Sequence, residues 1–190
     1  MRIAVIGTGN IGGTLGSRWR AAGQDVVYGS RSGPGEGPGG APLQPVGEAI
    51  AGADVVVLAI PGGAVADLLA EHGPALAGKT VIDATNNMGG PEFNSRAQIV
   101  AAAPGAHYVR AFNTLGWENF ADPLPGTQLF FAAEPTARQA AEELIAATGI
   151  EPVYVGDADA SKTVDGVLPL WFALMQRSGG NRKLALRVIR

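Results

Sequence analysis

The chain of 190 residues contains no cysteine and only two histidines, at positions 72 and 107. The absence of cysteine excludes disulfides, thiolate metal ligands and cysteine nucleophiles. The scarcity of histidine argues against a histidine-rich metal site. We therefore expect neither a metal centre nor thiol chemistry.

The sequence also lacks an excess of basic residues and any long apolar run. Its formal net charge is −3, which argues against a nucleic-acid partner. No stretch approaches the roughly 20 apolar residues of a membrane span. The apolar run at the start of the chain ends in glycine after a few residues, too short for a secretory signal. These features favour a cytoplasmic protein with neither nucleic acid nor membrane among its partners.

What the sequence does contain is an alternation of short β-branched runs with helical periodicity. The pattern predicts strands at 2–6, 25–29, 54–60, 79–85, 106–112, 127–133 and 151–157. It predicts helices at 10–23, 46–53, 62–72, 95–105 and 135–149. This alternation is typical of an α/β fold with a doubly wound, mostly parallel Rossmann-type sheet, and the length fits a single domain over 1–190.

Two segments depart from this rhythm. Residues 30–45 are rich in glycine and proline and are expected to form a loop that does not cross the core. The segment from about 160 to 190 is expected to be helical, with an interruption around 178–181 and a bend or late start at Pro169. Because this helical segment lies outside the strand–helix alternation, it could cover the cleft or pair with another subunit.

The stretch VIGTGNIGG places three glycines in the spacing G-x-G-x-x-G between a predicted strand and a predicted helix. In that context the first permits a tight turn, the second lets the backbone approach a pyrophosphate, and the third lets helix and strand pack closely. The helix N-terminus offers N–H groups and partial positive charge to the phosphates. A structural turn without a ligand is the alternative. The predicted cofactor-binding residues are Gly7, Thr8, Gly9, Asn10, Ile11 and Gly12.

The second predicted strand ends in Ser30 and Arg31, where an NAD-binding chain usually has Asp or Glu. A carboxylate there would accept hydrogen bonds from the ribose 2′-OH and would repel a 2′-phosphate. A hydroxyl and a guanidinium instead suit a phosphate, and Ser32 adds a further donor. The pair therefore predicts NADP(H) over NAD(H), with a solvated arginine on a loop as the alternative.

Polar residues follow the middle strands, where the nicotinamide ring of this architecture lies. Asp83 could cap a loop or take part in catalysis. Asn86 and Asn87 could bind a ligand or turn the chain. Asn113 and Thr114 are polar for their setting after the fifth strand.

No proton-transfer arrangement is evident among the ionisable residues. The histidines are predicted away from the cleft, the tyrosines lie within strands, and Lys162 is either solvated or near the cleft. An enzyme without an evident acid or base suits direct hydride transfer between two bound rings.

The stretches MRIAVIGTGNIG, YGSRSG, LAIPGGAV, RAFNTLGW and VDGVLPLWFAL resemble the NADPH-dependent reductases of the 8-hydroxy-5-deazaflavin coenzyme F420. The resemblance covers nearly the whole chain in order. It implies hydride exchange between NADP(H) and the deazaflavin, stacked face to face, usually in a homodimer.

The resemblance also implies roles for particular residues. Thr8, Ser30 and Arg31 match residues at the NADP phosphates. Ala59, Ile60 and Pro61 match the strand end that lines the dinucleotide, and Asn113 is a further predicted cofactor-binding residue. Thr114 and Leu115 match residues beside the nicotinamide, and we take them as the catalytic pair. Asn86, Trp117 and Ser161 are predicted on the substrate side.

Two other functions remain open. The chain could use NADPH to reduce another small acceptor, such as an imine, an enamide or a quinone. It could then use Asn113 or Lys162 to deliver a proton, with Trp117 shaping a different pocket. It could alternatively be a non-catalytic NADP-binding sensor or partner protein.

Overall fold

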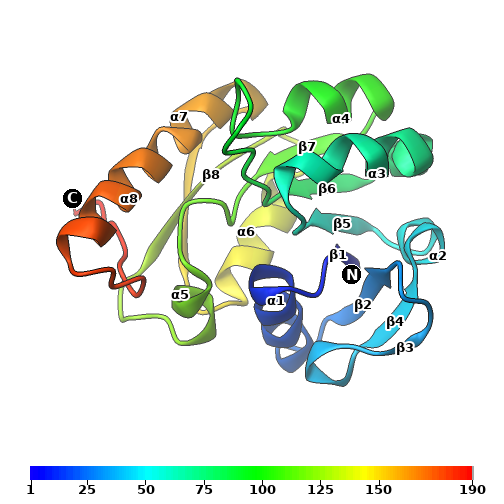
Figure 1. Ribbon diagram of the computed structural model, residues 1–190, viewed down its shortest axis with the longest axis horizontal. Coiled ribbons are helices and arrows are strands. Elements are labelled where there is room, and N and C mark those ends of the chain that lie inside the picture. Colours follow the sequence, from blue (N-terminus) through cyan, green and yellow to red (C-terminus); the bar gives the residue numbers. More distant parts are fainter. Residues whose placement is uncertain (190) are drawn as a thin grey trace.

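The computed structural model describes residues 1–189, which build a nine-stranded sheet with helices on both faces (Figure 1). The predicted domain ends at Arg190, which lies outside the described residues. Across the sheet, the strands are β3 (Gly35–Glu36), β4 (Pro42–Pro45), β2 (Asp25–Ser30), β1 (Arg2–Ile6), β5 (Val55–Leu58), β6 (Thr80–Asp83), β7 (His107–Arg110), β8 (Gln128–Ala133) and β9 (Glu151–Gly156). Only the pairs β3–β4 and β7–β8 are antiparallel among these described strands. The expected doubly wound, mostly parallel sheet is confirmed.

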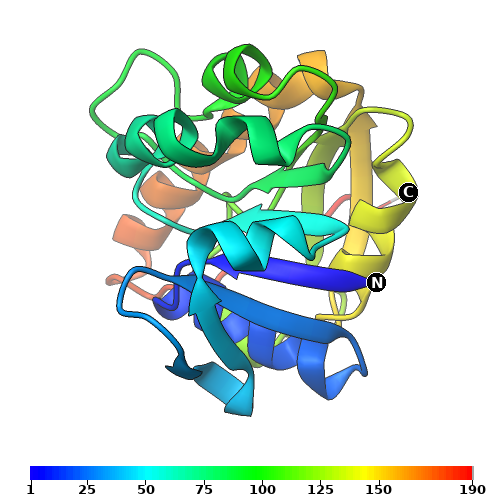
Figure 2. The ribbon, with the colours of Figure 1, turned by 90° about the vertical axis from the view of Figure 1, so that its right-hand side faces the viewer.

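The two faces of the sheet are covered by different helices, as the turned view in Figure 2 also shows. One face packs against α1 (Asn10–Ala21), α5 (Trp117–Ala121), α6 (Arg138–Ala146) and α8 (Val167–Arg177). The other packs against α2 (Val46–Ala51), α3 (Val65–His72) and α4 (Arg96–Ala102). Because side chains alternate along a strand, Ile3 and Val5 enter the first core while Ala4 and Ile6 enter the second.

Helix α1 is held in place by the periodic apolar face that its sequence predicts. Leu15 and Trp19 are fully buried, and Ile11 is partly buried against the same core. The indole Nε1 of Trp19 donates to the carbonyl oxygen of Leu144 on α6, at 2.8 Å. This bond ties together two helices that are far apart in sequence.

The expectation of a plain loop over residues 30–45 is wrong. Strands β3 and β4 form a small antiparallel hairpin, and β4 pairs in parallel with the edge of β2. The turn is possible because Gly39 and Gly40 adopt positive φ angles of 65° and 72°. Pro42 and Pro45 are tolerated because this hairpin forms the margin of the sheet.

The C-terminal segment is helical only in part, so the expected helix to the end of the chain is wrong beyond Arg177. Helix α7 (Ser161–Asp165) and helix α8 meet at Gly166, and Pro169 lies in the first turn of α8, where it costs no helical hydrogen bond. Residues 178–189 have no regular secondary structure. The segment is instead fastened by side chains, since Trp171 Nε1 donates to Leu184 O and Gln128 Oε1 accepts from the Val188 N–H.

Within residues 1–189 no helix is both long enough and apolar enough to cross a bilayer.

Candidate functional site at the carboxyl ends of the strands

The glycine-rich turn between β1 and α1 has the close geometry that its spacing predicts. Gly7 has a φ of 112°, and a Cβ atom on Gly12 would lie 2.1 Å from the carbonyl oxygen of Gly7. A Cβ on Gly9, in contrast, would meet nothing within 4 Å. Gly7 and Gly12 are therefore required by the fold itself, whereas Gly9 borders open space from which a ligand can approach the protein backbone.

The first turn of α1 is suited to an anion. Its N-cap residue, Gly9, makes no side-chain capping bond, and the first turn carries no acidic residue. Such a helix start has N–H donors without intrahelical acceptors and a partial positive charge. Open space at Gly9 and an uncapped helix start beside it fit a dinucleotide pyrophosphate. Asn10 is exposed here, and Ile11 is partly exposed.

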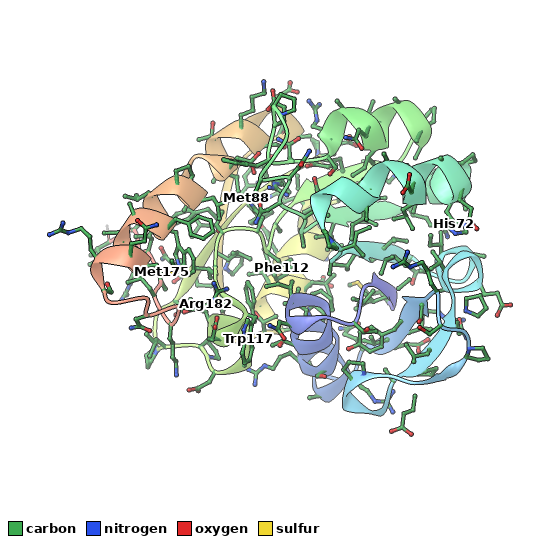
Figure 3. All side chains as sticks on the ribbon, viewed as in Figure 1. His72, Met88, Phe112, Trp117, Met175 and Arg182 are labelled. Atoms are coloured by element: carbon green, nitrogen blue, oxygen red, sulfur yellow. The ribbon has the colours of Figure 1, made fainter. Side chains whose placement is uncertain are left out.

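A pocket of about 470 Å³ adjoins this turn and brings together several of the predicted cofactor residues. These are Gly7, Thr8, Ser30, Arg31, Ser32, Ile60 and Pro61. Sequence analysis missed the opposite wall, which is one face of α3 and its preceding turn. That wall consists of Ala64, Asp67, Leu68, Glu71 and His72, whose spacing of three and four residues is the signal that would have identified it. In the view of Figure 3, His72 lies at the α2–α3 side of the molecule.

The serine–arginine pair lies at the pocket with its donors available. The Oγ atom of Ser30 accepts from the Ser32 N–H at 3.0 Å, which orders the turn after β2. Arg31 is exposed, and among residues 1–189 no hydrogen bond or ion pair engages its side chain. A guanidinium without a protein partner, at the mouth of a pocket beside a helix start, can bind a phosphate.

A second cluster, which we call the Arg110 cluster (Asp83, Arg110, Asp165 and the polar groups bonded to them), lies at the ends of β6 and β7. Arg110 is completely buried. Its Nε and Nη2 atoms contact Asp165 Oδ1 at 2.7 and 2.6 Å, and its Nη1 atom lies 3.3 Å from Asp83 Oδ1. Nη1 also donates to the carbonyl oxygens of Asp83 and Thr85, and Nη2 donates to Asn86 Oδ1. One guanidinium thus joins two strands, the loop after β6 and helix α7.

The carboxylate of Asp83 has a structural role, which is one of the two roles that the sequence allowed. It accepts hydrogen bonds from the N–H and hydroxyl of Thr85, the N–H of Ser95 and the hydroxyl of Tyr108. Burial, followed by the charge of Asp83, raises the pKa of Tyr108 well above 10.0, so this phenol stays protonated and donates. Asp83 therefore holds the loop after β6 and is not exposed to a substrate.

Residues 113–115 are buried, and Asn113 is bonded to this cluster. Asn113 donates through Nδ2 to Asp165 Oδ1 at 3.1 Å, and its carbonyl oxygen accepts from Asn86 Nδ2 at 2.9 Å. Thr114 and Leu115 are 1% and 8% exposed. Phe112, which precedes them, has a φ of 64°, the one positive value outside glycine among the described residues. Strain of this kind is concentrated at functional sites.

The residues predicted on the substrate side do not gather in one pocket. Ser161 is buried, donates to Ala158 O, and lines a pocket of about 430 Å³ between α4 and α7. Trp117 is partly exposed at the start of α5 and lies near the centre of Figure 3, below Phe112. Lys162 is exposed and pairs with Glu92 at 2.7 Å.

Ala59, a predicted cofactor-binding residue, packs behind the glycine turn, where its carbonyl oxygen would be 2.4 Å from a Cβ on Gly7.

The sequence of the N-terminal part of the chain matches a known family. Residues 2–87 match the family described as NADP oxidoreductase coenzyme F420-dependent. Over this segment the chain is similar to NADP-dependent oxidoreductases. The matched residues include the glycine turn, the serine–arginine pair and the Ile60–Pro61 wall of the pocket, so the resemblance expected from these stretches is confirmed there.

Solved structures agree on the fold. A candidate F420-dependent NADP reductase from Arthrobacter sp. FB24 is similar with a TM-score of 0.83 and 24% identity, over 100% of both chains. A hypothetical protein from Sinorhizobium meliloti is similar with a TM-score of 0.73 and 27% identity, over 100% of this chain and 96% of that one. A reductive aminase from Aspergillus terreus in complex with NADPH is similar with a TM-score of 0.72 and 22% identity, over 94% of this chain and 62% of that one.

Proposed function

We propose that the protein transfers hydride between NADPH and a deazaflavin of the F420 type. The observation that carries the nucleotide half is the pocket that joins Arg31, Ser30 and Thr8 beside the uncapped start of α1. The deazaflavin half rests on the description of the matched family. When bound, NADPH supplies a hydride and leaves as NADP⁺, while solvent supplies the proton that completes the reduced deazaflavin.

In this proposal the protein binds and orients the rings and delivers no proton. The histidines and Tyr108 already contact other side chains of the protein. His107 lies at the beginning of β7 and contacts Thr136 and Glu134, and His72 contacts Glu71 in the nucleotide pocket. Tyr108 is committed to Asp83. An acceptor that needs no side-chain acid is the one that such a site can serve.

The test is a rapid-mixing absorbance assay with the purified protein, NADPH and an oxidised deazaflavin. We expect loss of deazaflavin absorbance with NADPH and little or none with NADH. If NADPH binds but no absorbance is lost, the acceptor is a different molecule and the nucleotide site stands. If neither nucleotide binds, the proposal fails altogether.

A second candidate is reduction of an imine, an enamide or a quinone with the same NADPH site. The similarity of fold to a reductive aminase is the observation that favours it. A screen of such acceptors, with the oxidation of NADPH as the readout, distinguishes the two candidates. Turnover of an imine requires a proton donor, so its rate should fall in Asn113→Ala or Lys162→Ala. Binding of NADPH without turnover of any acceptor would instead favour an NADP-binding sensor.

The homodimer implied by the resemblance stays a prediction. Light scattering on the purified chain tests it, with a mass of twice 19.4 kDa as the expected result.

A further inference from the structure

The Arg110 cluster contains an unequal number of opposite charges. One guanidinium, which is 0% exposed, faces two carboxylates, Asp83 at 0% and Asp165 at 7% side-chain exposure. With all three groups ionised, the cluster has a net charge of −1. A buried charge is weakly screened by water and by salt, so it acts over a longer distance than a charge at the surface.

The hydrogen bonds of the two acidic side chains come from donor groups. Every recorded partner of Asp83 and Asp165 is a donor: backbone N–H groups, hydroxyls, side-chain amides and the guanidinium. Asp165 Oδ2, for example, accepts from Asn94 Nδ2 at 2.7 Å, while its Oδ1 accepts from Arg110 and Asn113. A carboxylate accepts hydrogen bonds and donates none, so this set of partners suits two carboxylates beside one guanidinium.

The cluster lies where the nicotinamide end of the dinucleotide is expected. Asp83 and Arg110 are the last residues of β6 and β7 and face each other in register. The loop after β6 reaches the edge of the nucleotide pocket, because Pro61 lines the pocket and a Cβ on the next residue, Gly62, would lie 2.6 Å from the Cα of Asn87. Asn86, beside Asn87, is bonded to Arg110. In doubly wound sheets the ligand lies in the crevice outside these strand ends.

We propose that the net negative charge of the Arg110 cluster stabilises the oxidised, positively charged nicotinamide ring relative to the reduced, neutral ring. This inference rests on the proposed NADP(H) site. Loss of hydride from C4 removes two electrons and one proton and leaves the ring with a positive charge, while the electrophilic acceptor takes the hydride. A buried negative charge near the ring favours that change. The protein therefore makes bound NADPH a stronger hydride donor than free NADPH, which shifts the equilibrium between the enzyme-bound states toward NADP⁺.

The test compares the dissociation constants of NADP⁺ and NADPH, which differ in ring charge. Replacement of Asp165 by Asn removes one buried charge and keeps the shape of the side chain. We expect Asp165→Asn to weaken binding of NADP⁺ relative to NADPH by roughly fivefold to tenfold, which is the scale of an interaction between two unit charges in a medium of intermediate dielectric. Isothermal titration with each nucleotide measures the ratio without any turnover.

Two control variants separate charge from structure. Asp165→Glu keeps the charge while it disturbs the packing, so its ratio should stay near that of the wild type. Asp159→Asn removes an exposed carboxylate that lies six residues away and pairs with Arg96 at 2.9 Å, and its ratio should also be unchanged. Equal changes in both dissociation constants for Asp165→Asn, or the same shift in Asp165→Glu, would overturn the proposal.

The wild type provides a second measurement if Asp165→Asn does not fold. It should bind NADP⁺ at least as tightly as NADPH, and the ratio should stay constant from about 0.05 to 0.5 M salt, because a buried charge is poorly screened. Preference for NADPH by tenfold or more would contradict the inference. Failure of the wild type to bind either nucleotide would overturn the proposed function, whereas binding of both with the wrong ratio would overturn this inference alone.

Discussion

The two ends of the site are built in opposite ways. At the nucleotide end, the donors are open: Arg31 is exposed and the start of α1 has no side-chain cap. At the Arg110 cluster, the polar groups are bonded to one another across 24 to 71 residues of sequence, and Asp83 and Arg110 are fully buried. The first end is arranged to bind a charged ligand that arrives from solvent. The second end fixes the relative positions of the strand-end loops before any ligand arrives.

The comparison predicts its largest effect at the buried end. Arg110→Met should lower the free energy of unfolding by about 3–5 kcal/mol, because it leaves two buried carboxylates without a counter-ion. Arg96→Met is the matched control, since Arg96 pairs with the exposed Asp159 and should cost less than about 1 kcal/mol. Urea unfolding of both variants measures the difference. Similar losses in the two variants would show that the cluster is not a structural centre.

Tyr108→Phe should have the next largest effect on stability. Loss of the hydrogen bond to the Asp83 carboxylate should cost about 1.5–3 kcal/mol near pH 7. Because the pKa of Tyr108 is raised in the folded protein, the wild type gains this contribution below about pH 10 and loses it as the pH rises further, when the unfolded chain ionises. Unfolding curves of the two proteins should therefore converge at high pH, and parallel curves would contradict the assignment.

Two glycines of the nucleotide end provide a sharper test, because they are alike in sequence and different in space. Gly12→Ala places a Cβ against the Gly7 carbonyl and should cost roughly 1–3 kcal/mol of stability. Gly9→Ala meets open space and should leave stability nearly unchanged while it weakens NADPH binding. Unfolding and binding measurements on both variants make the comparison. Normal NADPH affinity in Gly9→Ala would mean that the pyrophosphate binds elsewhere.

The contrast between the two ends also explains what the sequence could predict. The glycine turn, the serine–arginine pair and α1 depend on residues close together in the chain, and their positions follow from spacing and residue type. The Arg110 cluster depends on partners that only the folded sheet brings together. Arg110 itself is the last residue of a short strand, HYVR, and no feature of the neighbouring sequence distinguishes a buried arginine there from a solvated one.

Two errors of the sequence prediction have local causes. The glycine and proline content of residues 30–45 suggested a loop, yet the same glycines permit the turn that lets β4 pair with β2. The apolar residues after Asn181 suggested a helix, but side chains of Gln128 and Trp171 bind that backbone in an irregular conformation. The positive φ of Phe112 has no signal in the sequence at all.

The most direct test of the central claim is to measure, by calorimetry, the binding of NADPH and NADH to the wild type and to Arg31→Ala. The open guanidinium of Arg31 should contribute roughly 1.5–3 kcal/mol to NADPH binding through a charge-assisted phosphate contact. The variant should therefore bind NADPH about tenfold to a hundredfold more weakly and bind NADH with nearly unchanged affinity. Equal losses for the two nucleotides would contradict the account, because Arg31 would then act on a part of the dinucleotide that both share.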